Sequence, residues 1–256
     1  MDNIHIRPFK WGKDYKKLFK VASEVWFFDS KKSVSFLSTT AFMLHYLNNA
    51  TSLLVAADKD DNFLGLLGLT NKVDRPALRK NRFICCRARV MEHAARMLLY
   101  VWPGARNSRL IEGLFVDNHT RLRKMVPDSS APEVLVIIVN TAAKGLGVGK
   151  KLIEAVEEQL RSQGFKSYYL ITDSSCDFGF YDHIGMKRAV DVSMSFNICH
   201  IPEFNHGNNG FLRGYVYTKE LGQAPFPAAA KAAAPAAAAT ADSKSNDGSG
   251  QGSTGK

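Results

Sequence analysis

The sequence predicts an α/β domain built on a mixed, mainly antiparallel sheet with one central parallel pair of strands. The apolar run from Val134 to Val139 indicates a buried strand, and a helical pattern follows from Val148 to Gln163. Ser167 to Thr172 is a second apolar run, so strand, helix and strand should form a right-handed parallel crossover. Two further pairs of strand candidates, in 51–70 and 190–218, each flank a turn and favour antiparallel neighbours.

Each of the other elements follows from the period of its apolar residues or from a turn signal. Alternating apolar residues favour strands, and apolar residues every three or four positions favour helices. Asp14 stands where it can cap the first helix, and the polar turn Lys59–Asn62 indicates a hairpin. In order, we expect a strand over Ile4–Pro8, a helix with apolar residues from Leu18 to Trp26, a helix over Val34–Leu47, strands over Thr51–Ala57 and Phe63–Thr70, a short helix over Phe178–His183, and strands over Val190–Ile198 and Phe211–Thr218.

A basic segment interrupts this order before the central strand. From Lys72 to Lys124 there are 13 Lys and Arg against 4 Asp and Glu, so this segment holds nearly all of the formal charge of +10. Met91–Val101 has a helical period and ends at the breaker Trp102–Gly104, and shorter helical pieces are expected on either side. Such a patch could attract an acidic partner or steer a polyanionic ligand, or it could be a solvated helical face.

The C-terminal residues differ in composition from the rest of the chain. From Gln223 onward the sequence is mainly Ala, Pro, Ser, Gly and Lys, with Phe226 as its single aromatic residue. Because such a segment cannot bury a core, we expect 223–256 to be a disordered tail. The expected organisation is one domain over residues 1–222, with a basic helical insertion at about 72–126, followed by this tail.

Cysteine usage and hydropathy suggest a reduced compartment. The four cysteines have neither the spacing of zinc ligands nor that of a disulfide framework. The first residues contain no apolar signal core, and no stretch reaches the roughly 18 apolar residues of a membrane span. We therefore expect a cytoplasmic protein with no metal site and no membrane partner.

The residues between the central strand and its helix have the composition of an anion site. Glycines expose backbone N–H groups, a helix N-terminus adds about half a positive charge, and lysines add full charges. The glycines and lysines of this stretch are Lys144, Gly145, Gly147, Gly149, Lys150 and Lys151. The stretch therefore indicates a site for a phosphorylated ligand.

Two common nucleotide loops do not fit these residues. The nucleoside-triphosphate loop requires glycine where Lys144 stands, and Ser or Thr where Lys151 stands. The dinucleotide pattern G-x-G-x-x-G ends on Lys150 when it starts at Gly145, and on Leu152 when it starts at Gly147. Both loops are excluded.

A third pattern fits. The segment Lys144-Gly145-Leu146-Gly147-Val148-Gly149 resembles the Gln/Arg-x-x-Gly-x-Gly/Ala loop of the GCN5-related N-acetyltransferases, with lysine at its first position. About 31 residues later, Phe180–Met186 resembles the Phe-Tyr-x-x-x-Gly-Phe element of that family, with Met in place of the last aromatic residue. The order of strands and helices is also similar over about residues 4–221, with the basic segment as an insertion.

The resemblance implies the acyl-CoA N-acyltransferase fold, whose central parallel pair splays apart, and acetyl-coenzyme A as acyl donor. Loop N–H groups would hold its pyrophosphate, and the main chain at the end of the central strand would pair with its pantetheine arm and could stabilise the oxyanion. The implied contact residues are Ile137, Ile138, Val139, Lys144, Gly145, Leu146, Gly147, Val148, Gly149 and Lys150. The alternative to a cofactor-binding loop is an ordinary strand-to-helix turn without a ligand.

The same resemblance implies a proton donor. Tyr181 occupies the position from which a phenol can protonate the departing thiolate, and the alternative is a core tyrosine with a satisfied hydroxyl. Ser174 stands where the family often has an asparagine that contacts the cofactor, and the change to serine leaves that contact open.

A base is harder to predict. Glu133 lies eleven residues before Lys144, the spacing of the base glutamate in the histone-acetylating branch, although it could simply begin the strand. Asp173 and His183 are other titratable groups expected near the cleft, and water chains replace a single base in many relatives. Glu133 and Tyr181 are the predicted catalytic residues.

The predicted function is therefore transfer of the acetyl group of acetyl-coenzyme A to an amine by direct attack. Within the same chemistry, another acyl donor or another acceptor remains open. The alternative from another class is a non-catalytic acyl-CoA-binding module whose basic insertion docks an acidic or nucleic-acid partner. We expect no nucleic-acid partner, and a monomer or homodimer. The residues do not identify the acceptor.

Overall fold

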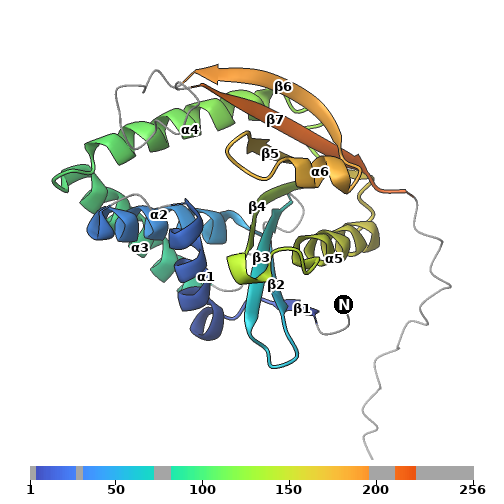
Figure 1. Ribbon diagram of the computed structural model, residues 1–256, viewed down its shortest axis with the longest axis horizontal. Coiled ribbons are helices and arrows are strands. Elements are labelled where there is room, and N and C mark those ends of the chain that lie inside the picture. Colours follow the sequence, from blue (N-terminus) through green and yellow to red (C-terminus); the bar gives the residue numbers. More distant parts are fainter. Residues whose placement is uncertain (1–3, 27–30, 72–81, 196–210, 223–256) are drawn as a thin grey trace, which may run out of the picture. The chain divides into compact units, whose positions relative to one another are not determined.

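The computed structural model of the protein describes residues 4–26, 31–71, 82–195 and 211–222 (Figure 1). They form a seven-stranded sheet in the order β1-β2-β3-β4-β5-β7-β6, in which β4 and β5 are the one parallel pair among the described strands. The predicted mixed, mainly antiparallel sheet is therefore confirmed. The strands are β1 (His5–Pro8), β2 (Ser52–Ala57), β3 (Phe63–Thr70), β4 (Glu133–Val139), β5 (Ser167–Asp173), β6 (Lys187–Ser195) and β7 (Phe211–Glu220).

Helices cover both faces of the sheet (Figure 1). Helix α5 packs on one face, where its residues at helical spacing, such as Leu152 and Val156, are fully buried. Residues of α1 and α2, such as Leu18 and Leu44, form a second core on the other face. The helices are α1 (Trp11–Trp26), α2 (Lys32–Asn49), α3 (Arg82–Val101), α4 (Arg106–Lys124), the 3₁₀ turn η2 (Thr141–Ala143), α5 (Val148–Ser162) and α6 (Gly179–His183).

The central strands are apolar without interruption because they are buried on both faces. In β3, Leu67 and Leu69 contribute to the core under α5, whereas Leu66 contributes to the core under α1 and α2. Successive strand residues point to opposite faces, so two covered faces require apolar residues at every position. At about 1.5–3 kcal/mol for each fully buried large apolar side chain, this burial accounts for the central position of β3 and β4.

The predicted cap of the first helix was wrong. Helix α1 begins at Trp11, so Asp14 lies inside its first turn and is fully buried. Its carboxylate accepts the backbone N–H of Lys10 at 2.8 Å and pairs with Arg7 at 2.7 Å. A carboxylate in the first turn can thus satisfy a free N–H group without standing at the cap position.

The basic segment is more regular than the sequence indicated. Residues 82–124 form two long helices, α3 and α4, where a helix over Met91–Val101 and shorter pieces were predicted. Ala95 and Leu99 of α3 are buried in one cluster with Leu37 of α2, so tertiary packing stabilises turns whose local pattern is weak.

The remaining predicted elements are present, with ends shifted by a few residues. Strand β6 begins at Lys187 instead of Val190, and β7 continues to Glu220. The predicted end of β6 at Ile198, the turn Pro202–Gly210 and the tail 223–256 lie outside the described residues.

Candidate active site at the fork between β4 and β5

The sheet opens between its two parallel strands. Strands β4 and β5 pair at only two positions, Glu133 with Tyr169 and Val134 with Leu170. Directly after these positions the register of β4 against β3 shifts, so that Leu135 is the extra residue of a β-bulge. The predicted splayed pair is confirmed, and we call the opening beyond Val134 the fork.

Main-chain groups of β4 face the open side of the fork. The N–H of Asn140 donates to Leu64 O in β3 at 2.8 Å, and Ile138 also pairs toward β3. Because successive strand residues alternate, the N–H and C=O groups of Ile137 and Val139 point the other way, toward the fork. No described strand pairs with them there. Of the three residues predicted to bind through their main chain, these two present it to the fork.

The loop after β4 needs its glycines for two different reasons. Gly145 and Gly147 have φ of +80° and +76°, a left-handed conformation that other residues adopt only with strain. Gly149 has no such φ, but a Cβ built on it would lie 3.1 Å from Cζ of Phe180. The ring that precedes Tyr181 therefore packs directly on the glycine loop, and the two sequence motifs are in contact.

The first turn of α5 presents free N–H groups. Val148, Gly149 and Lys150 open the helix, where N–H groups have no partner within the helix, and no other described group accepts their hydrogens. The positive end of the helix dipole adds to them. Lys144 is exposed without an ion pair to a described residue, whereas Lys150 lies 3.9 Å from Glu154. The first turn of α5 therefore has the N–H donors that a phosphate requires, and the side chain of Leu146 is exposed at the tip of the loop.

Tyr181 lies in the middle of the short helix α6, in the core that α5 forms with the sheet. Its ring is 7% exposed and packs against Phe180 and Tyr217, with centroids 5.3 and 5.4 Å away. Its hydroxyl makes no hydrogen bond to a described residue, so it lacks the partner that a purely structural core tyrosine would have. Burial raises the pKa of Tyr181, so the phenol keeps its proton at neutral pH.

Glu133 has partners of its own. Its carboxylate accepts Arg123 of α4 at 2.6 Å and the hydroxyl of Tyr169 at 3.1 Å, and the residue is 8% exposed. Of the other titratable groups considered, Asp173 is buried and accepts the N–H of Ser175, whereas His183 is exposed on α6. The structure does not test whether Glu133 acts as a base, and that role stays a prediction.

Ser174 follows β5 and takes part in the pairing with β7. Its N–H donates to Arg213 O at 2.9 Å, and its Oγ accepts the N–H of Arg213 at 3.0 Å. The hydroxyl hydrogen remains available as a donor. The predicted cofactor contact of Ser174 stays a prediction.

Two polar side chains near the fork were missed by the sequence analysis. Burial lowers the pKa of His119, which also interacts with Asp173, Arg123 and Glu133, and burial raises the pKa of Tyr46 to about 12, with Glu133 again nearby. Both side chains are half-buried. They come from α4 and α2, and no local motif connects these helices to β4.

Neither a metal-binding cluster nor a membrane-spanning helix is found in the described part of the chain. There, no three or more His, Cys, Asp and Glu are grouped so that they could hold a metal ion. None of the helices described is sufficiently long and apolar to span a membrane. Two cavities, of about 360 and 900 Å³, lie between α1, α2 and α3 and between α3 and α4, and no fork residue lines either of them.

A mixed sheet that forks at its parallel pair, with a glycine loop that opens the next helix, defines the acyl-CoA N-acyltransferase fold. Sequence comparison is more specific. Residues 16–185 match the Acetyltransferase (GNAT) family, and the chain belongs to this family. No curated protein matches the sequence.

Solved structures that match the chain are distant in sequence. A GCN5-related N-acetyltransferase from Kribbella flavida is 13% identical with a TM-score of 0.49, over 86% of this chain and 99% of that one. A GNAT family acetyltransferase from Elizabethkingia anophelis, with acetyl-CoA bound, is 16% identical with a TM-score of 0.46, over 86% and 100%. Ard1 from Thermoplasma volcanium is 12% identical with a TM-score of 0.47, over 86% and 98%.

Proposed function

We propose that this protein transfers the acetyl group of acetyl-coenzyme A to the nitrogen of an amine. The observation that carries the proposal is the fork: beyond Val134, β4 has a main-chain edge that no described strand pairs with. The loop after β4 leads into the N-terminus of α5, whose first N–H groups have no partner among the described residues. An extended amide-containing arm that ends in a pyrophosphate matches this sequence of groups, because amides pair with a strand edge and phosphates bind helix N-termini.

Donor binding uses the residues predicted from the motif. Ile137 and Val139 pair with the pantetheine arm through their main chain, and Ile138 holds the strand in the sheet. The pyrophosphate is held by the turn from Gly145 through Leu146, Gly147, Val148 and Gly149 to Lys150. Lys144 adds a positive charge at the entrance to this turn. From the other side of the fork, the Ser174 hydroxyl donates a hydrogen bond to acetyl-coenzyme A.

The reaction is direct attack without a covalent enzyme intermediate. The neutral amine attacks the thioester carbonyl, a C–N bond forms, and the developing oxyanion accepts a main-chain N–H of β4. The C–S bond then breaks. Tyr181, whose phenol carries its proton at neutral pH, donates that proton to the departing thiolate.

The amine must lose a proton before or during attack. We assign this proton to Glu133, whose two oxygens each accept one hydrogen bond and each retain a further acceptor site. Arg123 and Tyr169 hold the carboxylate in one orientation, which is what positioned acid–base catalysis requires.

The decisive experiment is an amine panel with acetyl-coenzyme A in which the released thiol is measured. A thermal shift with coenzyme A alone comes first, because a ligand that binds only the folded state raises the unfolding temperature. A shift together with turnover of one amine class supports the proposal. A shift without turnover of any amine supports a non-catalytic acyl-CoA-binding module, and no shift contradicts the assignment of the fork.

A further inference from the structure

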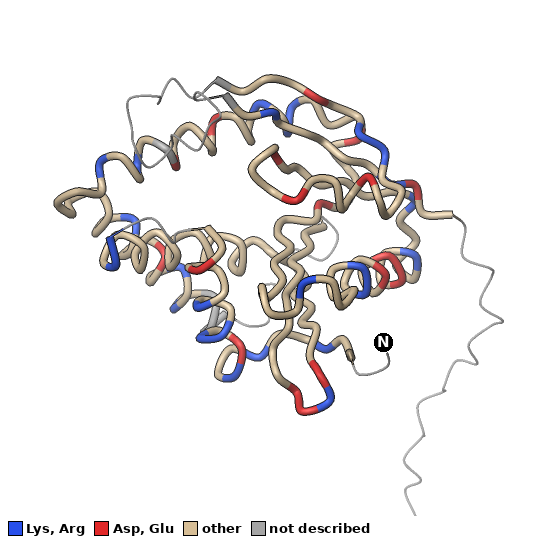
Figure 2. The backbone as a smooth tube through the Cα atoms, in the orientation of Figure 1, with Lys and Arg blue, Asp and Glu red and all other residues tan. Residues whose placement is uncertain are grey.

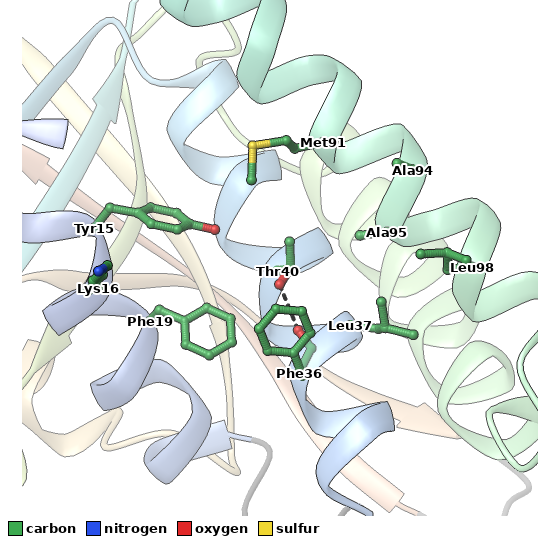
Figure 3. A pocket seen from close by; sticks show the side chains of 10 residues that line it. All are labelled: Tyr15, Lys16, Phe19, Phe36, Leu37, Thr40, Met91, Ala94, Ala95 and Leu98. Atoms are coloured by element: carbon green, nitrogen blue, oxygen red, sulfur yellow. Dashed lines mark hydrogen bonds between the residues drawn. The ribbon is translucent and has the colours of Figure 1, made fainter. Parts of the chain in front are cut away.

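An apolar groove lies between α1, α2 and α3, apart from the fork (Figure 3). Its volume is about 360 Å³, and none of the residues proposed for acetyl transfer lines it. Small-molecule sites have volumes of about 300–1,000 Å³, so the groove has room for one compact ligand.

Three aromatic rings form one side of the groove. Tyr15 and Phe19 come from α1 and Phe36 from α2, with centroids 6.4 Å apart for the first pair and 5.2 Å for the second (Figure 3). Rings at these separations present a surface on which a further ring can stack or pack edge to face. The aromatic wall therefore suits a flat, unsaturated body.

The hollow itself arises from small residues on α3. Ala94 and Ala95 line its floor, between Met91 and Leu98 one turn to either side, and Leu37 of α2 lies opposite (Figure 3). Because α3 carries alanines at this level, it approaches α2 without filling the space beside it. Larger residues at these positions would close the groove.

No described part of the chain covers the groove. Phe36, Leu98 and Met91 are 58%, 45% and 40% exposed, although each is a large apolar side chain. Leaving such side chains in water forgoes the stabilisation of burial, and contiguous exposed apolar surface commonly marks a binding site.

One positive charge lines the groove, and no acidic residue does. Lys16 of α1 is exposed and has no ion pair with a described residue. The acidic residue of α3, Glu92, is turned away and accepts Asn48 of α2 at 2.7 Å. The hydroxyl of Thr40 donates to Phe36 O at 2.7 Å, and Tyr15 stays neutral because burial raises its pKa. The charge is therefore available to an anion.

We propose that this groove binds a small amphipathic anion that has a flat aromatic body and one carboxylate. The body lies against Phe19 and Phe36 over the alanine floor, and the carboxylate pairs with Lys16. The site shares no residue with the fork.

Calorimetric titration of the full chain tests this, with 2-naphthoate, the uncharged 2-naphthylmethanol and the saturated decanoate as probes. We expect saturable binding of one 2-naphthoate per chain, and binding about threefold weaker or worse in Lys16→Gln, the usual scale for an exposed ion pair. Lys17→Gln is the matched control, because Lys17 is exposed on the same helix but does not line the groove. Ala94→Phe, which fills the hollow, should abolish binding.

Several outcomes overturn the proposal. Absence of 2-naphthoate binding at about 1 mM removes the site. If 2-naphthylmethanol binds as tightly as 2-naphthoate, or if Lys16→Gln and Lys17→Gln lose the same affinity, the groove does not recognise the carboxylate. If decanoate binds as tightly as 2-naphthoate, the groove does not recognise the aromatic body. If Ala94→Phe does not fold, Leu98→Asn replaces it, and unchanged binding there overturns the location. The coenzyme A thermal shift of every variant should stay at the wild-type value, which separates this test from that of the fork.

Discussion

At the residue scale, one of the glycines after β4 is in contact with the segment that contains Tyr181. The loop after β4 contains two glycines whose φ is positive, and the first turn of α5 contains a third glycine, Gly149, whose missing Cβ makes room for Phe180. The residue after Phe180 is Tyr181, the proposed proton donor. A change in the loop can therefore shift the position of Tyr181. Each of these residues can be tested by its own substitution.

Replacement of Tyr181 by phenylalanine should lower turnover while the affinity for acetyl-coenzyme A stays the same. The ring keeps its packing against Phe180 and Tyr217, and only the proton donor is lost, so kcat should fall on the order of 10²-fold or more. Steady-state kinetics with the amine found in the panel, together with the coenzyme A thermal shift, measure both effects. Unchanged turnover would remove Tyr181 from the mechanism.

Replacement of Gly147 by alanine should weaken donor binding. A Cβ at φ of +76° costs about 1–2 kcal/mol of backbone strain, and relief of that strain moves the N–H groups of the loop. Gly164→Ala is the matched control, since Gly164 has φ of +81° at the other end of α5. Both variants should lose similar stability in urea, but only Gly147→Ala should lose the coenzyme A thermal shift. Equal shifts in both would contradict the role of the loop.

The stability of the protein should decrease in mild acid through His119. Burial lowers the pKa of His119 in the folded state. As the pH falls below about 6.5, the usual pKa of histidine, His119 therefore binds a proton more readily in the unfolded chain than in the folded one. This contribution to stability is full above about pH 6.5 and is lost as the pH falls toward the folded pKa. Urea unfolding at pH 7 and pH 5 should therefore show a smaller decrease for His119→Gln than for the wild type, and an equal decrease would refute a buried neutral imidazole.

At the scale of elements, α4 is held to the base of the fork by one ion pair. Arg123 of α4 contacts Glu133 of β4, and Leu122 beside it is buried against β5 and β7. Lys and Arg residues recur along α3 and α4 (Figure 2). Arg123 among them is thus structural, whereas Arg87, Arg106 and Arg121 are exposed and have no ion pair to a described residue. Helices α3 and α4 therefore contribute buried side chains to the clusters that they share with the sheet and with α2.

Replacing one partner of this ion pair should lower the free energy of unfolding more than replacing both partners. Arg123→Met leaves the nearly buried carboxylate of Glu133 without its cation, and we expect a loss of about 1–3 kcal/mol in the free energy of unfolding. In Arg123→Met with Glu133→Gln the uncompensated charge is gone, so part of the loss should be recovered. A double variant as unstable as the sum of the single ones would show that the two residues act independently.

At the scale of the whole molecule, the two unusual segments should differ in importance. Truncation after Gly222 removes a segment with one aromatic residue, and it should leave the unfolding temperature and the coenzyme A shift unchanged. Replacement of residues 82–124 by a short linker should instead unfold the domain, because Leu122 and Ala88 contribute to separate buried clusters. Circular dichroism with temperature distinguishes these outcomes, and a stable domain without the helices would contradict their structural role.

The sequence by itself determined the order of the elements, the mixed sheet and the glycine loop. These follow from local regularities: a period of two or of 3.6, turn residues, and glycine at positions of positive φ. The family resemblance then led from two motifs to the splayed strands, and the structure confirmed the splay between β4 and β5.

Tertiary structure alone decided which distant side chains meet at the fork. It brought His119 and Tyr46 near Glu133, gave Glu133 an ion pair, and made α3 and α4 long helices. Contacts between residues so far apart in the chain depend on how whole helices pack on the sheet, and no local pattern records that packing. The glycine loop proposed to hold the pyrophosphate can therefore be recognised in the sequence, whereas the surroundings proposed for the amine are set by the fold.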